Sequence, residues 1–126
     1  MKAFLKNYRQ SPRKVRLVAR LIRGKSVPMA LVELALLSKR ASGPIEKLVR
    51  SAEANALNLS PSINKQQLFI KEIRVDQGVT MKRNTPGARG RAFPIRKRTS
   101  HVALTLEIKD KKEKIKKVST KKTLVS

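Results

Sequence analysis

The sequence has no cysteine, no tryptophan and one histidine, His101. The lack of cysteine excludes disulfide bonds, thiolate nucleophiles and cysteine-ligated zinc, and it leaves His101 as the only strong nitrogen ligand for a metal. Ser100 precedes His101, but neighbours on a strand point to opposite faces, so the two do not form a nucleophile and base pair. The run 86–91 lacks the spacing and the terminal Lys-Ser or Lys-Thr of a nucleotide-binding loop. We therefore expect no enzyme activity, no metal and no cofactor.

Carboxylates are also scarce. Eight aspartate and glutamate residues stand against 31 lysines and arginines, which gives a net charge of +23 and an isoelectric point of about 11.6. Such a chain repels itself unless a polyanion neutralises it. No stretch approaches the roughly 20 apolar residues that cross a membrane, so nucleic acid is favoured over membrane as the partner. Residues 1–7 lack the apolar run of a signal peptide, and we expect a cytoplasmic protein or one of an organelle matrix.

Aromatic residues make up 3% of the chain, namely Phe4, Tyr8, Phe69 and Phe93. They are too few to form a platform on which unpaired bases stack in series, so we expect binding to nucleic-acid backbone and shape. Hydrophobic residues still reach 40%, which is enough to offset the entropy lost on folding. A chain of 126 residues favours a single domain, and we assign this RNA-binding domain to residues 1–108.

The charges are segregated along the chain. Nine basic residues and no acidic one precede Glu33, and no carboxylate lies between Asp76 and Glu107. From Lys109 onward the chain has eight lysines, no arginine and few apolar residues. This composition predicts a flexible, Lys-rich tail at 109–126.

Three helices are predicted in the first half of the chain, after a short strand at 4–9. The first helix covers 13–23, since Ser11 suits the N-cap, Pro12 the first helical position and Gly24 the residue after the last turn. The second begins at 27 or 28 and runs to about 37, and its mostly apolar composition predicts burial. The third follows Ser42, Gly43 and Pro44. It has apolar residues at helical spacing from Ile45 to Leu59, and Ser60 and Pro61 end it.

The first helix carries a narrow stripe of arginines opposite its apolar face. At 100° per residue the stripe consists of Arg13, Arg16, Arg20 and Arg23. An ordinary solvated surface is the alternative interpretation of such a stripe. No carboxylate neighbours it here, so we expect these side chains to contact phosphate.

Two strands are predicted in the second half. The run 68–75 is short and rich in branched residues, and Phe69, Ile73 and Val75 share one side of it. Lys71 interrupts this pattern, which indicates a bulge or an edge position. The run 101–108 alternates cleanly between apolar and other residues, which predicts a strand with one buried face.

Residues 77–100 connect these strands and contain no carboxylate. Their seven cations are Lys82, Arg83, Arg89, Arg91, Arg96, Lys97 and Arg98. If the flanking strands pair antiparallel and continue, each arm projects about 30 Å from the body at roughly 3.3 Å per residue. Five of the cations are arginine, whose planar fork binds phosphate through two hydrogen bonds. Gly87 and Gly90 permit a positive φ, and Pro86 suits a turn near the tip. We expect a protruding basic hairpin; the alternative is a basic loop that only its partner orders.

Several motifs resemble one known family. They are SPRKVRLVA at 11–19, LIRGK at 21–25, SAEANA at 51–56, MKR at 81–83, ARGRA at 88–92 and IRKRTSH at 95–101. In this order they resemble the family of bacterial-type large-subunit ribosomal protein twenty-two, and together they cover most of positions 4 to 108. The resemblance implies an α+β fold, in which three helices pack on a small antiparallel sheet, with one long protruding β-hairpin and a basic C-terminal tail. It also implies a structural constituent of the large subunit that binds and stabilises rRNA during assembly, and whose hairpin lines the nascent-peptide exit tunnel.

The charge map and the resemblance together give the expected sites. The residues expected to bind rRNA are Arg9, Arg13, Lys14, Arg16, Arg20, Arg23, Lys25, Lys82, Arg83, Arg89, Arg91, Arg96, Lys97, Arg98 and His101. The expected tunnel-lining tip consists of Met81, Lys82, Arg83, Asn84, Thr85, Pro86, Gly87, Ala88, Arg89, Gly90 and Arg91. The implied partners are large-subunit rRNA, neighbouring ribosomal proteins that include the protein numbered four near the tunnel constriction, and the nascent polypeptide in passing.

Two other classes of function stay open at this point. A DNA-bending protein also uses basic arms, and Pro86 could wedge between base steps, although such proteins commonly dimerise and this chain offers one arm. Sedimentation with large subunits after nuclease treatment of DNA would separate this alternative from a ribosomal scaffold. An RNA-modifying enzyme would need a catalytic pair or a cofactor loop, and the sequence shows neither.

Overall fold

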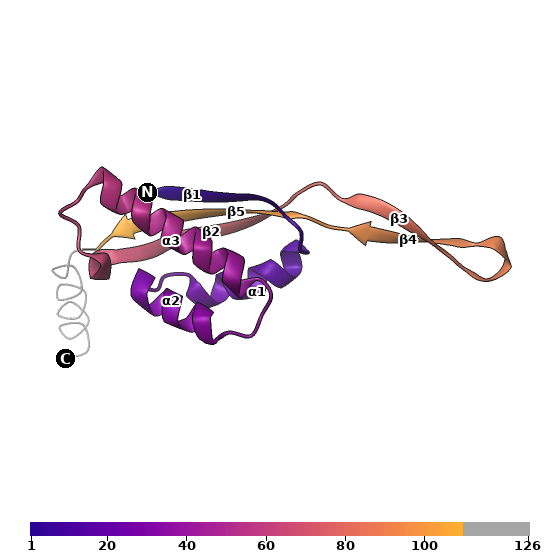
Figure 1. The fold of residues 1–126 in the computed structure, drawn as a ribbon, viewed down its shortest axis with the longest axis horizontal. Helices are drawn as coiled ribbons and strands as arrows, with labels where there is room; N and C mark the ends of the chain where they lie inside the picture. Colours follow the sequence, from indigo (N-terminus) through magenta and orange to yellow (C-terminus); the bar gives the residue numbers. More distant parts are fainter. Residues whose placement is uncertain (110–126) are drawn as a thin grey trace, which may run out of the picture.

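Three helices lie against one face of a three-stranded antiparallel sheet, and a two-stranded hairpin projects beyond the end of that sheet (Figure 1). The computed structural model describes residues 1–109, so the tail predicted at 109–126 lies outside them except for Lys109. In chain order the elements are β1 (Lys2–Tyr8), α1 (Pro12–Ile22), α2 (Val27–Leu36), α3 (Ser42–Leu59), the 3-10 turn η1 (Lys65–Gln67), β2 (Leu68–Gln77), β3 (Met81–Pro86), the turn η2 (Ala88–Gly90), β4 (Ala92–Lys97) and β5 (Ser100–Ile108). The α+β fold, the three helices and the protruding hairpin confirm the prediction.

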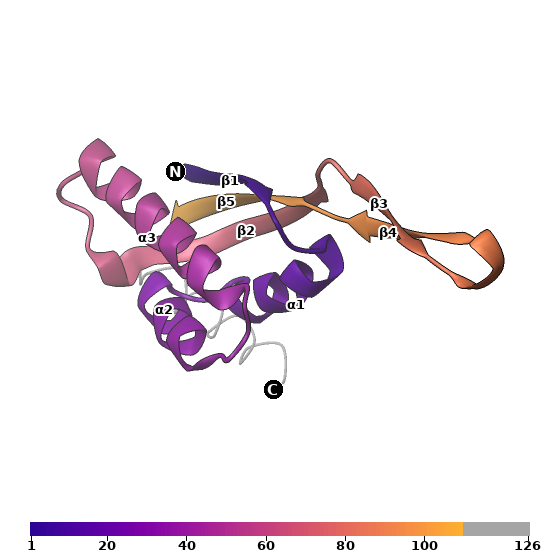
Figure 2. The same ribbon diagram turned by 45° about the vertical axis from the view of Figure 1, so that its right-hand side comes forward.

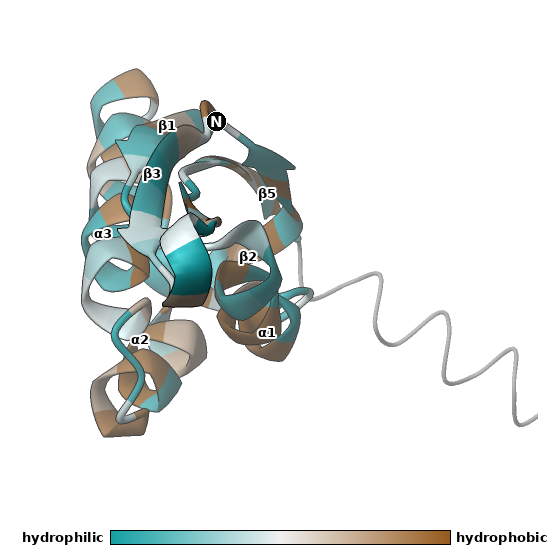
Figure 3. Ribbon diagram, turned by 90° about the vertical axis from the view of Figure 1, so that its right-hand side faces the viewer, coloured by the Kyte–Doolittle hydropathy of each residue, from teal (hydrophilic) through white to brown (hydrophobic). Residues whose placement is uncertain are grey.

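The sheet has the strand order β1-β5-β2, with β5 antiparallel to both neighbours. The central strand buries Val102, Leu104 and Leu106 on one face, as the alternation of 101–108 predicted. Helix α1 packs on β2, and α3 packs on β1 and β5. Helix α2 packs on α3 and is apolar over much of its surface (Figure 3). Only Val27, Ala30 and Leu34 are buried, and Met29, Val32 and Leu36 are exposed, so the prediction that this helix is mostly buried is wrong. The core therefore lies between the helices and a single face of the sheet.

A bulge in β2 decides which of its residues enter the core. The register of β2 against β5 shifts between Ile70 and Glu72, which confirms the bulge expected at Lys71. One extra residue reverses the alternation of side chains, so the buried residues of β2 are Leu68, Ile70, Ile73 and Val75. The expectation that Phe69 shares the side of Ile73 and Val75 is wrong, because the bulge turns Phe69 to the other face.

The outer edge of β2 is closed by the chain that follows α1. Gly24, with a φ of 76°, ends the helix in a left-handed conformation that glycine adopts at low cost. The Gly24 N–H then donates to the Ile70 carbonyl at 3.0 Å, and the Ile70 N–H donates to the Lys25 carbonyl at 2.9 Å. This pairing occupies backbone groups that an edge strand would otherwise leave open.

The hairpin is not a simple continuation of the sheet, which corrects the expectation of two uninterrupted arms. Strands β3 and β4 form a separate two-stranded ladder, and the segments 78–80 and 98–99 interrupt the pairing (Figure 2). We call these two segments the neck. In it, the Gly78 N–H donates to the Thr99 carbonyl at 2.9 Å, and the Thr99 hydroxyl donates to the Val79 carbonyl at 2.7 Å. A side chain at Gly78 would place its Cβ 2.5 Å from Thr99 Oγ1, so the neck requires glycine there.

The tip of the hairpin is a short turn over residues 87–91. The Gly87 N–H donates to the Arg91 carbonyl at 2.6 Å, and Arg89 and Gly90 have left-handed φ values of 56° and 71°. The positive φ expected at Gly90 is confirmed. Gly87 has a φ of −115°, so the same expectation is wrong for Gly87, and Arg89 takes the second left-handed position instead.

Candidate nucleic-acid interface

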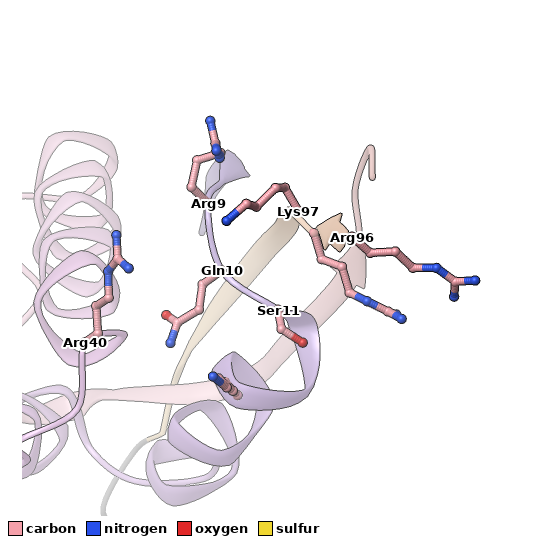
Figure 4. A pocket seen from close by; sticks show the side chains of 8 residues that line it. Arg9, Gln10, Ser11, Arg40, Arg96 and Lys97 are labelled. Atoms are coloured by element: carbon pink, nitrogen blue, oxygen red, sulfur yellow. The ribbon is translucent and has the colours of Figure 1, made fainter. Parts of the chain in front are cut away.

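A basic hollow of about 790 Å³ lies where the hairpin joins the body. Its walls come from the link between β1 and α1, the first turn of α1, the loop between α2 and α3, and the returning end of the hairpin (Figure 4). The lining residues are Arg9, Gln10, Ser11, Lys14, Arg40, Arg96, Lys97 and Arg98. Six of these eight side chains are cationic and none is a carboxylate, so the hollow is complementary to a polyanion.

Hydrogen bonds fix the walls of the hollow relative to one another. The Tyr8 hydroxyl donates to the Arg40 carbonyl at 3.2 Å, which ties the end of β1 to the loop between α2 and α3. The Ser100 hydroxyl donates to the Gln10 carbonyl at 3.1 Å, which ties the link between β1 and α1 to the start of β5. Three stretches that are distant in sequence, namely 9–14, the loop with Arg40, and 96–98, are thereby brought together around the hollow.

The carboxylates of the described residues lie elsewhere, on the body. Five of them form ion pairs, which are Lys25–Glu33, Arg50–Glu46, Lys65–Glu53, Lys71–Glu107 and Arg74–Asp76. Most of these pairs are exposed, and such pairs contribute little to stability. These pairs leave positive charge unevenly distributed between the body and the hairpin. The acids neutralise cations of the body, and the hollow and the hairpin keep their full positive charge.

The arginine stripe on α1 divides into two pairs with different roles. Arg16 donates from Nε and Nη2 to the Val75 carbonyl at 3.2 and 3.0 Å, and Arg23 donates from Nη2 to the Ile73 carbonyl at 2.9 Å. These two arginines complete the closure of the β2 edge. Arg13 and Arg20 are exposed and have no hydrogen-bond or ion-pair partner within residues 1–109. Half of the stripe thus also binds the sheet, and the contact of all four arginines with phosphate stays a prediction.

Two other predicted rRNA-binding residues also have partners within the chain. Lys25 Nζ lies 2.6 Å from both carboxylate oxygens of Glu33. His101 Nδ1 accepts from the Asn7 N–H at 3.0 Å, at the point where the pairing of β1 with β5 shifts register and Asn7 has a φ of 55°. The hydrogen bond to Nδ1 places a proton on Nε2 in the neutral ring. His101 thus stabilises an irregular stretch of β1, which is a structural role.

The hairpin presents cations on both of its faces. In the β3–β4 ladder Lys82 pairs with Arg96, whereas Arg83 and Lys97 occupy the neighbouring positions and point to the opposite face. All seven cations predicted for this segment are exposed. A ribbon that is positive on both faces fits a channel with anionic walls better than a single flat surface.

Some interface residues could not be identified from the sequence. Arg40 lies in a stretch of mixed charge and gave no local signal, and only the fold brings it beside Arg9 and Lys14. Thr99 and Ser100 are buried polar residues that shape the neck and the hollow, and they were visible only as part of a motif. Within residues 1–109 no helix has the length and apolar character to cross a membrane, and no group of three or more acidic, histidine or cysteine residues is placed to hold a metal ion.

An α+β body with a carboxylate-free hollow and a basic arm is typical of a protein that binds nucleic acid. The family model described as Ribosomal protein L22p/L17e matches residues 3–107. The chain belongs to this family, whose members are structural proteins and not enzymes.

Individual relatives agree with the family match. The large ribosomal subunit protein uL22 of Pelotomaculum thermopropionicum is 52% identical over 112 residues, which are 89% of this chain and 96% of the relative. The protein of the same name from Mesoplasma florum is 50% identical over 103 residues, which are 82% of this chain and 91% of the relative. That of Myxococcus xanthus is 48% identical over 105 residues, with 82% and 92% covered. The match spans nearly all of each relative, so the DNA-bending and enzymatic alternatives are set aside.

Proposed function

We propose that this chain is a structural constituent of the large ribosomal subunit that binds and stabilises large-subunit rRNA during assembly, while its hairpin lines the nascent-peptide exit tunnel. It acts in the cytoplasm as part of the ribosome. The relatives are named as large-subunit proteins, and this placement is carried over from them. The body, within a single domain at 1–108, holds the rRNA, and the hairpin reaches into it.

One observation carries the rRNA-binding part of this proposal, namely the hollow at the base of the hairpin. Six cations from three distant stretches of the chain line it without a carboxylate, and hydrogen bonds hold its walls in place. Ser11 lines the hollow and makes no side-chain capping bond, so the positive end of the α1 dipole adds to the attraction for phosphate. A folded RNA backbone supplies the matching negative charge.

The remaining predicted sites receive roles by position. Arg13 and Arg20 extend the binding surface along α1, and Arg89 and Arg91 contact phosphates at the tip. The segment from Met81 to Arg91, which runs from the neck to the tip, forms part of the tunnel wall, where the nascent polypeptide passes it. The neighbours are other large-subunit proteins, and the protein numbered four lies beside the tip near the tunnel constriction.

A matched pair of variants tests the role of the hollow. Arg40→Met removes a cation that lines it, and Lys39→Met removes the preceding exposed cation, which does not. We expect Arg40→Met to reduce the slope of log affinity for large-subunit rRNA against log salt by roughly 0.7 to 0.9, the value for one phosphate contact. Lys39→Met should leave the slope unchanged. If both variants reduced the slope equally, the hollow would bind rRNA no more specifically than the rest of the positive surface.

A further inference from the structure

Phe93 and Gly87 form a contact across the tip of the hairpin, and the distribution of charged residues does not explain it. Phe93 pairs with Thr85 in the ladder, and its ring lies against Gly87, which is two residues after Thr85 and directly follows β3. A Cβ at Gly87 would overlap Phe93 Cε2 and would come within 2.8 Å of Cδ2. The missing side chain of Gly87 therefore makes room for the ring, and the ring covers the start of the turn.

This contact leaves the ring of Phe93 held in place but largely exposed. Phe93 is 58% exposed, and Ile95, two residues further along β4, shares its face of the strand. The turn beneath it is fixed by the Gly87–Arg91 hydrogen bond and by the left-handed Arg89 and Gly90. A flat apolar surface is thus presented in a defined orientation among cations, and the described residues provide nothing to cover it.

We propose that Phe93 stacks on an unpaired nucleobase of the RNA that surrounds the arm. The proposal rests on the proposed function, because it takes rRNA to be that surrounding. Cations on both faces of the hairpin place phosphate backbone around the tip, and the flat apolar groups in RNA are its bases. Stacking on an aromatic ring is a common means by which proteins hold unpaired bases, and it requires no particular base. One ring offers one base a stacking surface, which is consistent with the low aromatic content of the chain.

The stacked base would fix the tip in register with the RNA. Phosphate contacts through long, mobile side chains position the arm only loosely, whereas a rigid ring against a base defines one depth of insertion. Phe93 is therefore a positioning residue for the tip, and Gly87 acts through it.

The test uses the full-length chain incorporated into large subunits, with 2′-hydroxyl acylation as the probe of nucleotide mobility. Phe93→Leu keeps an apolar cover over Gly87 but removes the flat ring, and Phe93→Tyr keeps the ring. We expect Phe93→Leu to raise acylation at one or two unpaired nucleotides by roughly fivefold, the lower end of what a lost stacking contact implies. Phe93→Tyr should match the original chain. Gly87→Ala should raise acylation at the same nucleotides as Phe93→Leu, because its Cβ displaces the ring.

The outcomes separate this inference from the proposed function. Subunits that contain Phe93→Leu at full occupancy but show the original acylation pattern would overturn the stacking proposal and leave rRNA binding intact. A rise in acylation over all nucleotides around the arm would also overturn it, because it would indicate a loosened hairpin. A change in contact with the nascent chain, without a change in acylation, would overturn it as well. Failure of the unaltered chain to enter subunits would instead contradict the proposed function.

Discussion

Arg16 on α1 donates two hydrogen bonds to the main-chain carbonyl of Val75 on β2, at 3.2 Å from Nε and 3.0 Å from Nη2. The sequence pattern places Arg16 in a stripe expected to bind phosphate, but in the structure Arg16 also binds the edge of the sheet. Arg23, two helical turns after Arg16, donates one hydrogen bond to the main-chain carbonyl of Ile73. The guanidinium of Arg16 has five N–H donors, so it keeps donors and its full charge for RNA while it binds the carbonyl.

The two pairs of the stripe should respond differently to mutation. Arg16→Met preserves the aliphatic stem but removes both hydrogen bonds, and it should lower the free energy of unfolding by about 1 kcal/mol. Arg20→Met removes an unpartnered cation, so it should leave stability within about 0.5 kcal/mol and weaken rRNA binding instead. Urea denaturation and rRNA titration of both variants check this. A larger loss of stability from Arg20→Met would contradict the division.

Thr99 is expected to stabilise the pairing of the hairpin strands more than the fold of the body. Thr99→Val removes the hydroxyl that donates to the Val79 carbonyl, and the amides of β3 and β4 should then exchange with solvent several-fold faster than in the original chain. The amides of β2 and β5 should be unaffected, since their ladder does not include the neck. Thr99→Ser retains the hydroxyl and is the control. Equal exchange in the Val and Ser variants would show that the neck hydrogen bond has no role.

His101 should prove structural. His101→Ala leaves the Asn7 N–H without its acceptor and should lower the free energy of unfolding by about 1 kcal/mol. The salt dependence of rRNA binding should stay the same, because no phosphate contact is removed. If the slope fell with stability unchanged, His101 would be an RNA contact as first predicted and its bond to Asn7 would be incidental.

The cations of the hairpin should account for much of the electrostatic binding. Replacement of all seven with glutamine should reduce the slope of log affinity against log salt by roughly 5 to 6, if each cation contacts one phosphate. The body should remain folded, because these side chains are exposed and do not contribute to the core. Circular dichroism checks the fold, and filter binding over a range of salt concentrations checks the slope. An unchanged slope would show that the seven cations of the hairpin do not contact phosphates.

Local sequence patterns predicted most of the fold. Neighbouring residues determine local backbone geometry, and this geometry is reflected in the alternation of 101–108, the caps at Ser11 and Gly24, and the interruption at Lys71. The face of Phe69 was predicted wrongly for a related reason. A bulge is visible in a sequence, but its effect on the residues before it depends on the register with a partner strand.

The site was only partly predictable, because charge shows which residues seek a polyanion but not which of them the fold uses internally. Arg16 and Arg20 look alike in sequence, and only the position of β2 distinguishes them. Arg40 joins the hollow through a loop whose place is fixed by Tyr8, a contact between residues 32 apart in the chain. The neck depends on Gly78 and Thr99 meeting across the two arms, and no local pattern indicates that the ladder breaks there.

The most direct measurement is a cryo-EM map of large subunits that carry this chain. The account predicts density for residues 77–100 enclosed by rRNA, with phosphates within hydrogen-bond distance of Lys82, Arg83 and Arg96, with the hollow beside Arg40 filled by RNA backbone, and with the turn at 87–91 at the tunnel wall. Subunits in which the body is bound but the hairpin extends into solvent, or in which the hollow faces no RNA, would contradict it.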